Sequence, residues 1–100
     1  HLGPLFTAWC AVNRVTATGR ILGENERIDV EDALHAITLG AAFTLKLDTE
    51  IGSIETGKRA DFAILEGDPL SVESMQLKDI PIWGTVIGGE IFPCSEIDCP

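Results

Sequence analysis

The spacing of apolar residues changes at Leu47, and this change limits the possible folds more than any other feature of the sequence. Before Leu47, apolar residues recur every three or four positions, which is the period of an α-helix. After it, short apolar segments alternate with glycine, aspartate and proline, a pattern typical of strands and turns. Helices followed by strands predict an α+β fold. The chain has 100 residues, enough for one modest domain but not for a complete (β/α)8 barrel.

Two helices are predicted in the first half, separated by a loop over residues 16–26. The first covers residues 4–15 and starts at Pro4, which suits a first helical turn. Its apolar stripe is Leu5, Ala8, Trp9, Val12 and Val15. The second starts after Asp29, whose carboxylate is expected to accept a hydrogen bond from the amide of Asp32. Its predicted buried stripe is Val30, Ala33, Leu34, Ile37, Ala41 and Leu45. We expect a kink, or two short helices meeting, at Thr38–Gly40 because glycine destabilises a helix interior.

Short strands are predicted in the second half. The apolar run Asp61–Glu66 lies between turn residues and predicts a strand buried on both faces. Residues 71–77 predict a turn of helix, and residues 82–92 predict a hairpin around Gly88 and Gly89. So few strands can neither close a barrel nor form two complete sheets, so at least one strand edge must be exposed. The sequence therefore reads as part of a larger structure.

Charge and cysteine content exclude several classes of protein. The 7 basic and 16 acidic residues give a net charge of −9, which opposes binding to nucleic acid and to anionic membrane surfaces. No apolar run approaches the roughly 18 residues of a membrane span, and the first residues lack the basic stretch of a signal peptide. The 3 cysteines are too few for a disulfide scaffold, so we expect a reducing, cytoplasmic location.

The segment Gly52–Arg59 nearly matches a phosphate-binding loop of the form G-x-x-x-x-G-K-[ST]. Arg59 stands where a hydroxyl residue is required, and Glu55 would bring a negative charge into the phosphate cradle. A strand, not a helix, is predicted next. The segment is therefore interpreted as a structural turn. Asp61, which follows it, is interpreted as a clamp whose carboxylate accepts the amides of that turn, with a catalytic carboxylate as the alternative.

Side chains able to bind a metal or act as a nucleophile are few. His1 and His35 are the only histidines, and His35 is expected to be solvated or half-buried. Cys94 and Cys99 are two thiols where zinc needs four ligands; we expect free thiols on the tail, with a local disulfide as the alternative. Cys10 is expected to pack in the first helix. The serines Ser53, Ser71, Ser74 and Ser95 lack a G-x-S-x-G context.

Several segments together resemble the end of a known family. They are Asp29-Val-Glu-Asp-Ala-Leu34, Thr38-Leu-Gly-Ala-Ala42, Gly52-Ser-Ile-Glu-Thr-Gly-Lys-Arg-Ala-Asp61, Asp68-Pro69 and Thr85-Val-Ile-Gly-Gly89. With Leu5–Arg14 and Arg20–Gly23, they resemble the C-terminal segment of proteins of the metal-dependent amidohydrolase superfamily. The branch is the amidohydrolase-3 or YtcJ-like one, which includes proteins labelled exoenzyme regulatory proteins. The resemblance extends from Gly3 to Phe92.

The resemblance implies a parent protein with a (β/α)8 barrel and one or two divalent metal ions of the zinc type. Such a protein hydrolyses carbon–nitrogen bonds other than peptide bonds, with the metal polarising a carbonyl and activating water. The family's ligands are a His-x-His pair, a bridging Lys or Glu, two later histidines and an Asp. No residue of this chain matches one of them. We therefore expect no catalytic, cofactor-binding or metal-binding residue here, and no activity from the fragment alone.

The resemblance also implies how the chain divides. Residues 1–46 would be the last helices of the barrel, residues 47–93 the C-terminal part of an incomplete β-sandwich, and residues 94–100 a tail. The remaining sandwich strands come from the N-terminus of the family. We expect neither a nucleic-acid nor a membrane partner, but a homo-oligomer or the missing barrel and N-terminal strands. A free-standing structural or protein-interaction module derived from the family is the alternative, and a small enzyme in its own right is a third.

Overall fold

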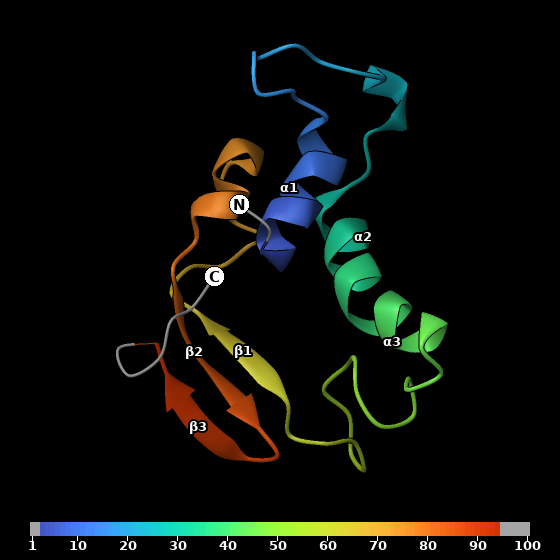
Figure 1. Ribbon diagram of the computed structural model, residues 1–100, viewed down its shortest axis with the longest axis vertical. Coiled ribbons are helices and arrows are strands. Elements are labelled where there is room, and N and C mark those ends of the chain that lie inside the picture. The colour runs from blue at the N-terminus through green and yellow to red at the C-terminus, as the bar shows by residue number, and fades with distance from the viewer. Residues whose placement is uncertain (1–2, 95–100) are drawn as a thin grey trace.

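The computed structural model describes residues 3–94. Its elements in chain order are α1 (Pro4–Asn13), η1 (Glu24–Glu26), α2 (Val30–His35), η2 (Ala36–Gly40), α3 (Ala41–Thr44), β1 (Phe62–Leu65), η3 (Ser74–Asp79), β2 (Ile82–Ile87) and β3 (Glu90–Pro93). The helices gather at one end, and the strands form an open antiparallel sheet at the other (Figure 1). The predicted α+β fold is confirmed. No helix within residues 3–94 is both long and apolar enough to cross a bilayer.

A small hydrophobic core joins the two halves of the chain. It combines Ala8 and Trp9 of α1 with Ala33 of α2, Leu77 of η3 and Ile80, which directly follows η3. The predicted stripe of α1 is thus confirmed, with its other members packed around this core. The helix ends two residues earlier than predicted, because Arg14 adopts left-handed backbone angles (φ 56°, ψ 38°). The Arg14 N–H donates to the carbonyl of Cys10, and α1 ends at this left-handed residue.

The second helix begins where the sequence predicts, at the residue after Asp29. The predicted capping bond is wrong, because the Asp29 carboxylate accepts no hydrogen bond from the first turn of α2. This turn is exposed, so water can satisfy its free amides. Glu31 and Asp32 lie in the same turn, where negative charge is favoured near the positive end of the helix dipole.

The helix changes register at the interruption predicted near Gly40. Residues 36–40 form a π-helical turn, which holds one residue more than an α-helical turn. Ala42 therefore takes the buried place predicted for Ala41 and is only 3% exposed. Ala41 is exposed, and Leu45 is 68% exposed. The predicted stripe is thus correct through Ile37 and wrong for its last two members, since a strict 3.6-residue period does not allow for the extra residue.

The hairpin predicted over residues 82–92 is confirmed. β2 and β3 pair antiparallel around Gly88 and Gly89, whose positive φ angles of 59° and 85° fit a tight two-residue turn. Residues Phe62–Leu65 form the predicted strand, but its predicted burial on both faces is wrong. Phe62 and Ile64 are each 36% exposed. The reason is that the sheet is a single layer, and none of the helices within residues 3–94 lies across its faces (Figure 1).

Candidate functional site

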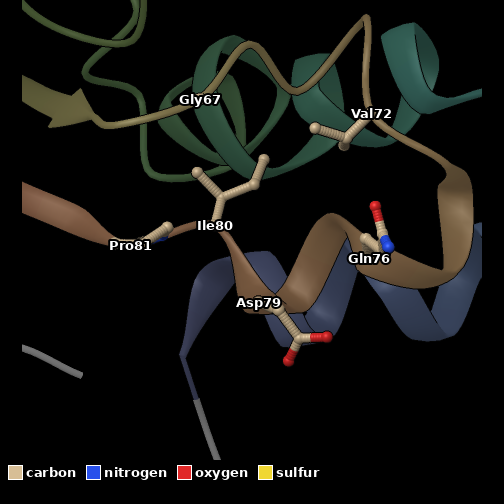
Figure 2. Close-up of a pocket in the computed structure, with 6 residues that line it drawn as sticks. All are labelled: Gly67, Val72, Gln76, Asp79, Ile80 and Pro81. Atoms are coloured by element: carbon tan, nitrogen blue, oxygen red, sulfur yellow. The ribbon is translucent and has the colours of Figure 1, made fainter.

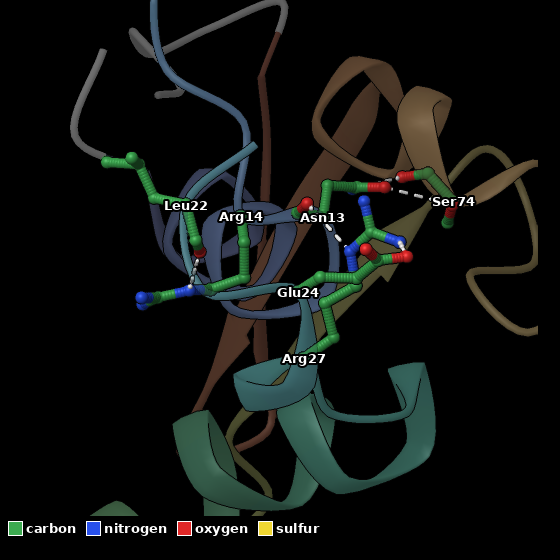
Figure 3. Close-up of polar contacts among 6 residues, drawn as sticks. All are labelled: Asn13, Arg14, Leu22, Glu24, Arg27 and Ser74. Carbon is green, nitrogen blue, oxygen red and sulfur yellow. Dashed lines mark hydrogen bonds and ion pairs between the residues drawn. The ribbon is translucent and has the colours of Figure 1, made fainter. Parts of the chain in front are cut away.

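The most buried polar cluster lies where α1 meets η3 (Figure 3). Asn13, 6% exposed, donates from Nδ2 to the carbonyls of Trp9 (3.1 Å) and Ser74 (2.9 Å). The Ser74 hydroxyl donates back to Asn13 Oδ1 at 3.0 Å. The Trp9 indole N–H donates to the carbonyl of Met75 at 2.8 Å. Three of these four hydrogen bonds, all but the one from Asn13 to Trp9 within α1, fasten the end of α1 to a segment about sixty residues away, so the cluster fixes the fold across the core.

Two arginines tie the loop after α1 to the same region. Arg27 donates from Nε to the carbonyl of Asn13 at 3.1 Å, and its guanidinium lies 4.0 Å from the Glu24 carboxylate. Arg14 donates from Nε to the carbonyl of Leu22 at 2.9 Å (Figure 3). Both arginine side chains therefore donate hydrogen bonds to backbone carbonyl groups. With its amide, hydroxyl and guanidinium groups, the cluster contains no nucleophile paired with a base, so its role is structural.

Sequence reasoning did not single out Asn13, and it considered Ser74 only as a nucleophile, which lacks a G-x-S-x-G context. The available signal was a polar residue four positions after Trp9, on an otherwise apolar helix face. That position points into the core, where an amide needs partners. The signal gives no information about which distant residue supplies them.

A shallow cavity of about 300 Å³ lies between the loop after β1 and η3 (Figure 2). It is lined by Gly67, Val72, Gln76, Asp79, Ile80 and Pro81. The side chains of Val72 and Ile80 point towards each other across it, whereas the carboxylate of Asp79 points away (Figure 2). Asp79 is paired with Lys78 at 3.0 Å. The lining therefore offers an apolar surface and one amide, but no acid–base pair for catalysis.

The glycine-rich segment 52–59 forms a turn closed by its own side chains. Lys58 Nζ donates to the Ser53 hydroxyl at 2.7 Å and lies 3.0 Å from the Glu55 carboxylate, which also accepts from Ser53. The hydrogen bond from Ser53 is the main cause that lowers the pKa of Glu55 below its usual value. The hydrogen bond and the positive charge of Lys58 lower this pKa further. The lysine is thus paired inside the turn, and strand β1 follows. This geometry agrees with a structural turn and not with a phosphate loop.

Asp61 does anchor a turn, but not the predicted one. Its Oδ1 accepts from the N–H of Gly88 at 2.7 Å, across the sheet, and not from the preceding turn over residues 57–59. The reason is the antiparallel pairing of β1 and β2, which brings the start of β1 beside the hairpin turn at the end of β2. The side chain is exposed. Asp61 therefore fixes the hairpin turn to the start of β1.

The described residues do not fit the zinc-type metal that the resemblance implies for the parent. Within residues 3–94, no three His, Cys, Asp or Glu side chains come together as a metal would require. His35 is exposed. The serine hydroxyls of Ser53 and Ser71 bind the carboxylates of Glu55 and Asp68. His1 and Ser95 lie outside the described residues. We derive no catalytic step through a metal from this chain.

The cysteines differ from the expectation of free thiols on the tail. Cys10 is free and half-buried, whereas Cys94 is disulfide-bonded, so the expectation is wrong for Cys94. Cys99 lies outside the described residues. The N–H of Cys94 donates to the carbonyl of Trp83 at 2.8 Å, so Cys94 continues the pairing of β3 with β2. It is held by the sheet and does not belong to a loose tail.

Comparison with known proteins identifies the family. The model of the amidohydrolase family matches residues 2–93, and the chain belongs to this family, as the sequence resemblance indicated. The N-substituted formamide deformylase of Arthrobacter pascens is 33% identical over 86 residues, covering 86% of this chain and 16% of the deformylase. The putative amidohydrolase YtcJ of Bacillus subtilis (strain 168) is 34% identical over 91 residues, covering 88% of this chain and 17% of YtcJ.

An imidazolonepropionase of Bacteroides fragilis is 34% identical over 67 residues, covering 67% of this chain and 16% of that protein. The matched part covers only 16% or 17% of each of these relatives, so the chain spans about a sixth of their length. No solved structure matches the chain significantly.

Proposed function

We propose that the chain is the C-terminal part of a metal-dependent amidohydrolase that hydrolyses carbon–nitrogen bonds other than peptide bonds. The observation that carries this proposal is the family match over residues 2–93. The named relatives support the substrate class, because one is a deformylase of N-substituted formamides. The 16% share of that relative supports the idea that most of the functional protein lies outside these 100 residues.

In this proposal the chain supplies structure and the rest of the protein supplies the metal ligands. Two observations support that division of roles. The described residues include no group that could hold a metal, and the polar side chains of Asn13, Lys58 and Asp61 are engaged in holding turns and helix ends. Residues 1–46 would pack on the barrel, and residues 47–93 would join further strands in a sandwich.

A free-standing structural or interaction module is the second candidate. The observation that favours it is the hydrophobic core, which combines Trp9, Ala33 and Leu77 from both halves of the chain. Such a core lets the chain fold around its own residues. The cytoplasmic location expected from the cysteine count belongs to either candidate, with the free thiol of Cys10 in its favour and the disulfide bond of Cys94 against it.

Two parallel assays test the proposal. The 100-residue chain and the longer protein that the proposal requires are each titrated with zinc by calorimetry and incubated with an N-substituted formamide, with release of the amine as the readout. We expect the longer protein to bind zinc, to release amine and to lose this activity with a chelator. The short chain should neither bind zinc nor release amine. Sub-micromolar zinc binding or amine release by the short chain would refute the structural role. A gene that starts directly before His1 would favour the free-standing module.

A further inference from the structure

The two edges of the sheet differ in how their backbone groups are directed. Trp83 of β2 bonds towards β3, since its carbonyl accepts from the N–H of Cys94. Because neighbours in a strand bond to opposite sides, Gly84 and Val86 bond towards β1, where they pair with Ile64 and Phe62. The residue between these two, Ala63, therefore directs its N–H and C=O away from β2, towards the free edge.

Only the β3 edge carries residues that block further pairing. Glu90 and Pro93 lie in β3, and a charge and a proline are typical devices that protect an edge strand. The β1 edge, in contrast, is Phe-Ala-Ile-Leu, without a charge or a proline. Among the described helices and strands, β1 packs closely only against β2. β1 is therefore the edge at which another strand can add.

One face of the sheet is apolar across all three strands. The register places Phe62, Val86 and Ile91 in one row. The next row is Ile64, Gly84 and Pro93. We call these six residues the apolar face. Ile91 is 58% exposed, and a strand added at β1 would extend this face without placing a polar side chain in it.

The chain exposes more surface than a folded monomer of its mass. Its accessible surface is 7125 Å² at 10.8 kDa, where a monomer of this mass is expected to expose about 5,500 Å². A standard interface removes about 800 Å² from each partner. The radius of gyration, 14.5 Å, also exceeds the roughly 13 Å of a compact chain of this length. The chain thus leaves more surface open to contact than a compact monomer of its mass does.

We propose that β1 of a second copy pairs antiparallel with β1 at this edge, giving a continuous six-stranded sheet around a twofold axis. Pairing centred on Ala63 sets Phe62 opposite Ile64 of the second copy, so apolar residues face each other. No acid stands opposite an acid, because Asp61 meets Leu65 and Glu66 meets Ala60. The contact is self-complementary, as a twofold interface requires. The net charge of −9 opposes association in general, but no pair of acids stands face to face at this contact. The proposal concerns the 100-residue chain by itself and does not depend on the hydrolytic function; in the longer protein of the proposed function, the further strands of the sandwich would compete with a second copy for this sheet.

Light scattering at about 100 μM, where micromolar complexes are populated, tests the pairing. We expect twice the 10.8 kDa mass for the unaltered chain. Ala63→Pro removes the outward N–H and leaves the β1–β2 bonds intact, so this variant should be monomeric. Ala63→Val keeps the N–H and should remain dimeric. Ile54→Lys, which charges an apolar side chain that is 83% exposed outside the sheet, should also remain dimeric. A monomeric unaltered chain, or an Ala63→Pro variant that folds and still dimerises, would overturn the proposal.

If Ala63→Pro fails to fold, hydrogen exchange of the Ala63 amide in the unaltered chain tests the proposal instead. In a dimer this amide is protected, and dilution of the unaltered chain should make its exchange faster as copies separate. Fast exchange at every concentration would show a free edge and contradict the proposal. Slow exchange that does not change on dilution would show that another segment of the same chain covers the edge, which also contradicts it.

Discussion

The Asn13 side chain gives the sharpest test of what holds the two halves of the chain together. Asn13→Ala removes the two hydrogen bonds from Nδ2 and the one accepted from Ser74. Each such bond contributes about 1 kcal/mol net, so the loss is about 3 kcal/mol. A domain of this size is stable by about 5–15 kcal/mol in total. At about 4–8 °C per kcal/mol, the melting temperature should fall by roughly 12–24 °C.

Urea and thermal unfolding followed by circular dichroism measure this loss directly. Ser74→Ala is the matched control, because it removes only the hydroxyl bond to Asn13 and leaves the Ser74 carbonyl to accept from Nδ2. It should cost about 1 kcal/mol. In the double variant the two losses should not add, since both changes remove the same Ser74–Asn13 bond. An ordinary surface substitution changes the free energy of unfolding by no more than about 0.5 kcal/mol. If the free energy of unfolding of Asn13→Ala lies within that range of the value for the unaltered chain, the assignment of this cluster to the core is incorrect.

Three further predictions concern the second half of the chain. A Cβ at Gly52 would lie 2.7 Å from the Cβ of Ala42, at a φ of +100°, so Gly52→Ala should cost about 1–3 kcal/mol in urea unfolding from overpacking alone; a neutral result would mean that the turn moves freely. Asp61→Ala should cost only about 1 kcal/mol, because the bond to Gly88 is exposed, and it should speed exchange of the Gly88 amide. The lowered pKa of Glu55 means that its ionised form supports the fold. Its contribution should be present near pH 7 and lost as the pH falls through the folded-state pKa, so Glu55→Gln should match the unaltered chain in acid but not at neutral pH.

Local signals in the sequence were sufficient to place the elements. Pro4 and Asp29 marked helix starts, and Gly88 with Gly89 marked the hairpin, because each acts on its own few residues. Two of the wrong predictions concerned which residues are buried. Ala42 replaces Ala41 because a π-helical turn adds one residue, and Phe62 is exposed because no second layer covers the sheet. Neither fact can be read from a local period.

The polar contacts were harder to predict, because they join residues far apart in the sequence. Asp61 was interpreted as an anchor of the preceding turn, yet its partner is the Gly88 amide, 27 residues away. Asn13 was not singled out, and Ser74, 61 residues away, was not recognised as its partner. A hydrogen bond between distant residues depends on which elements pack together, and apolar spacing predicts only which face is buried. The family resemblance, in contrast, depends on short sequence motifs such as residues 52–61, and the family match confirms it.

The fold separates what stabilises the chain from what leaves it open to association. The core and the Asn13 cluster lie between α1, α2 and η3, whereas the apolar face lies on the sheet, which no helix covers. Changes at two distant sites without shared partners are expected to add independently. Asn13→Ala should therefore lower the melting temperature and leave the dimer in place below it. Ala63→Pro should abolish the dimer while the helical core of the monomer persists. A chain in which Asn13→Ala also dissociates the dimer at temperatures where it remains folded would show that the sheet and the helices form one cooperative unit.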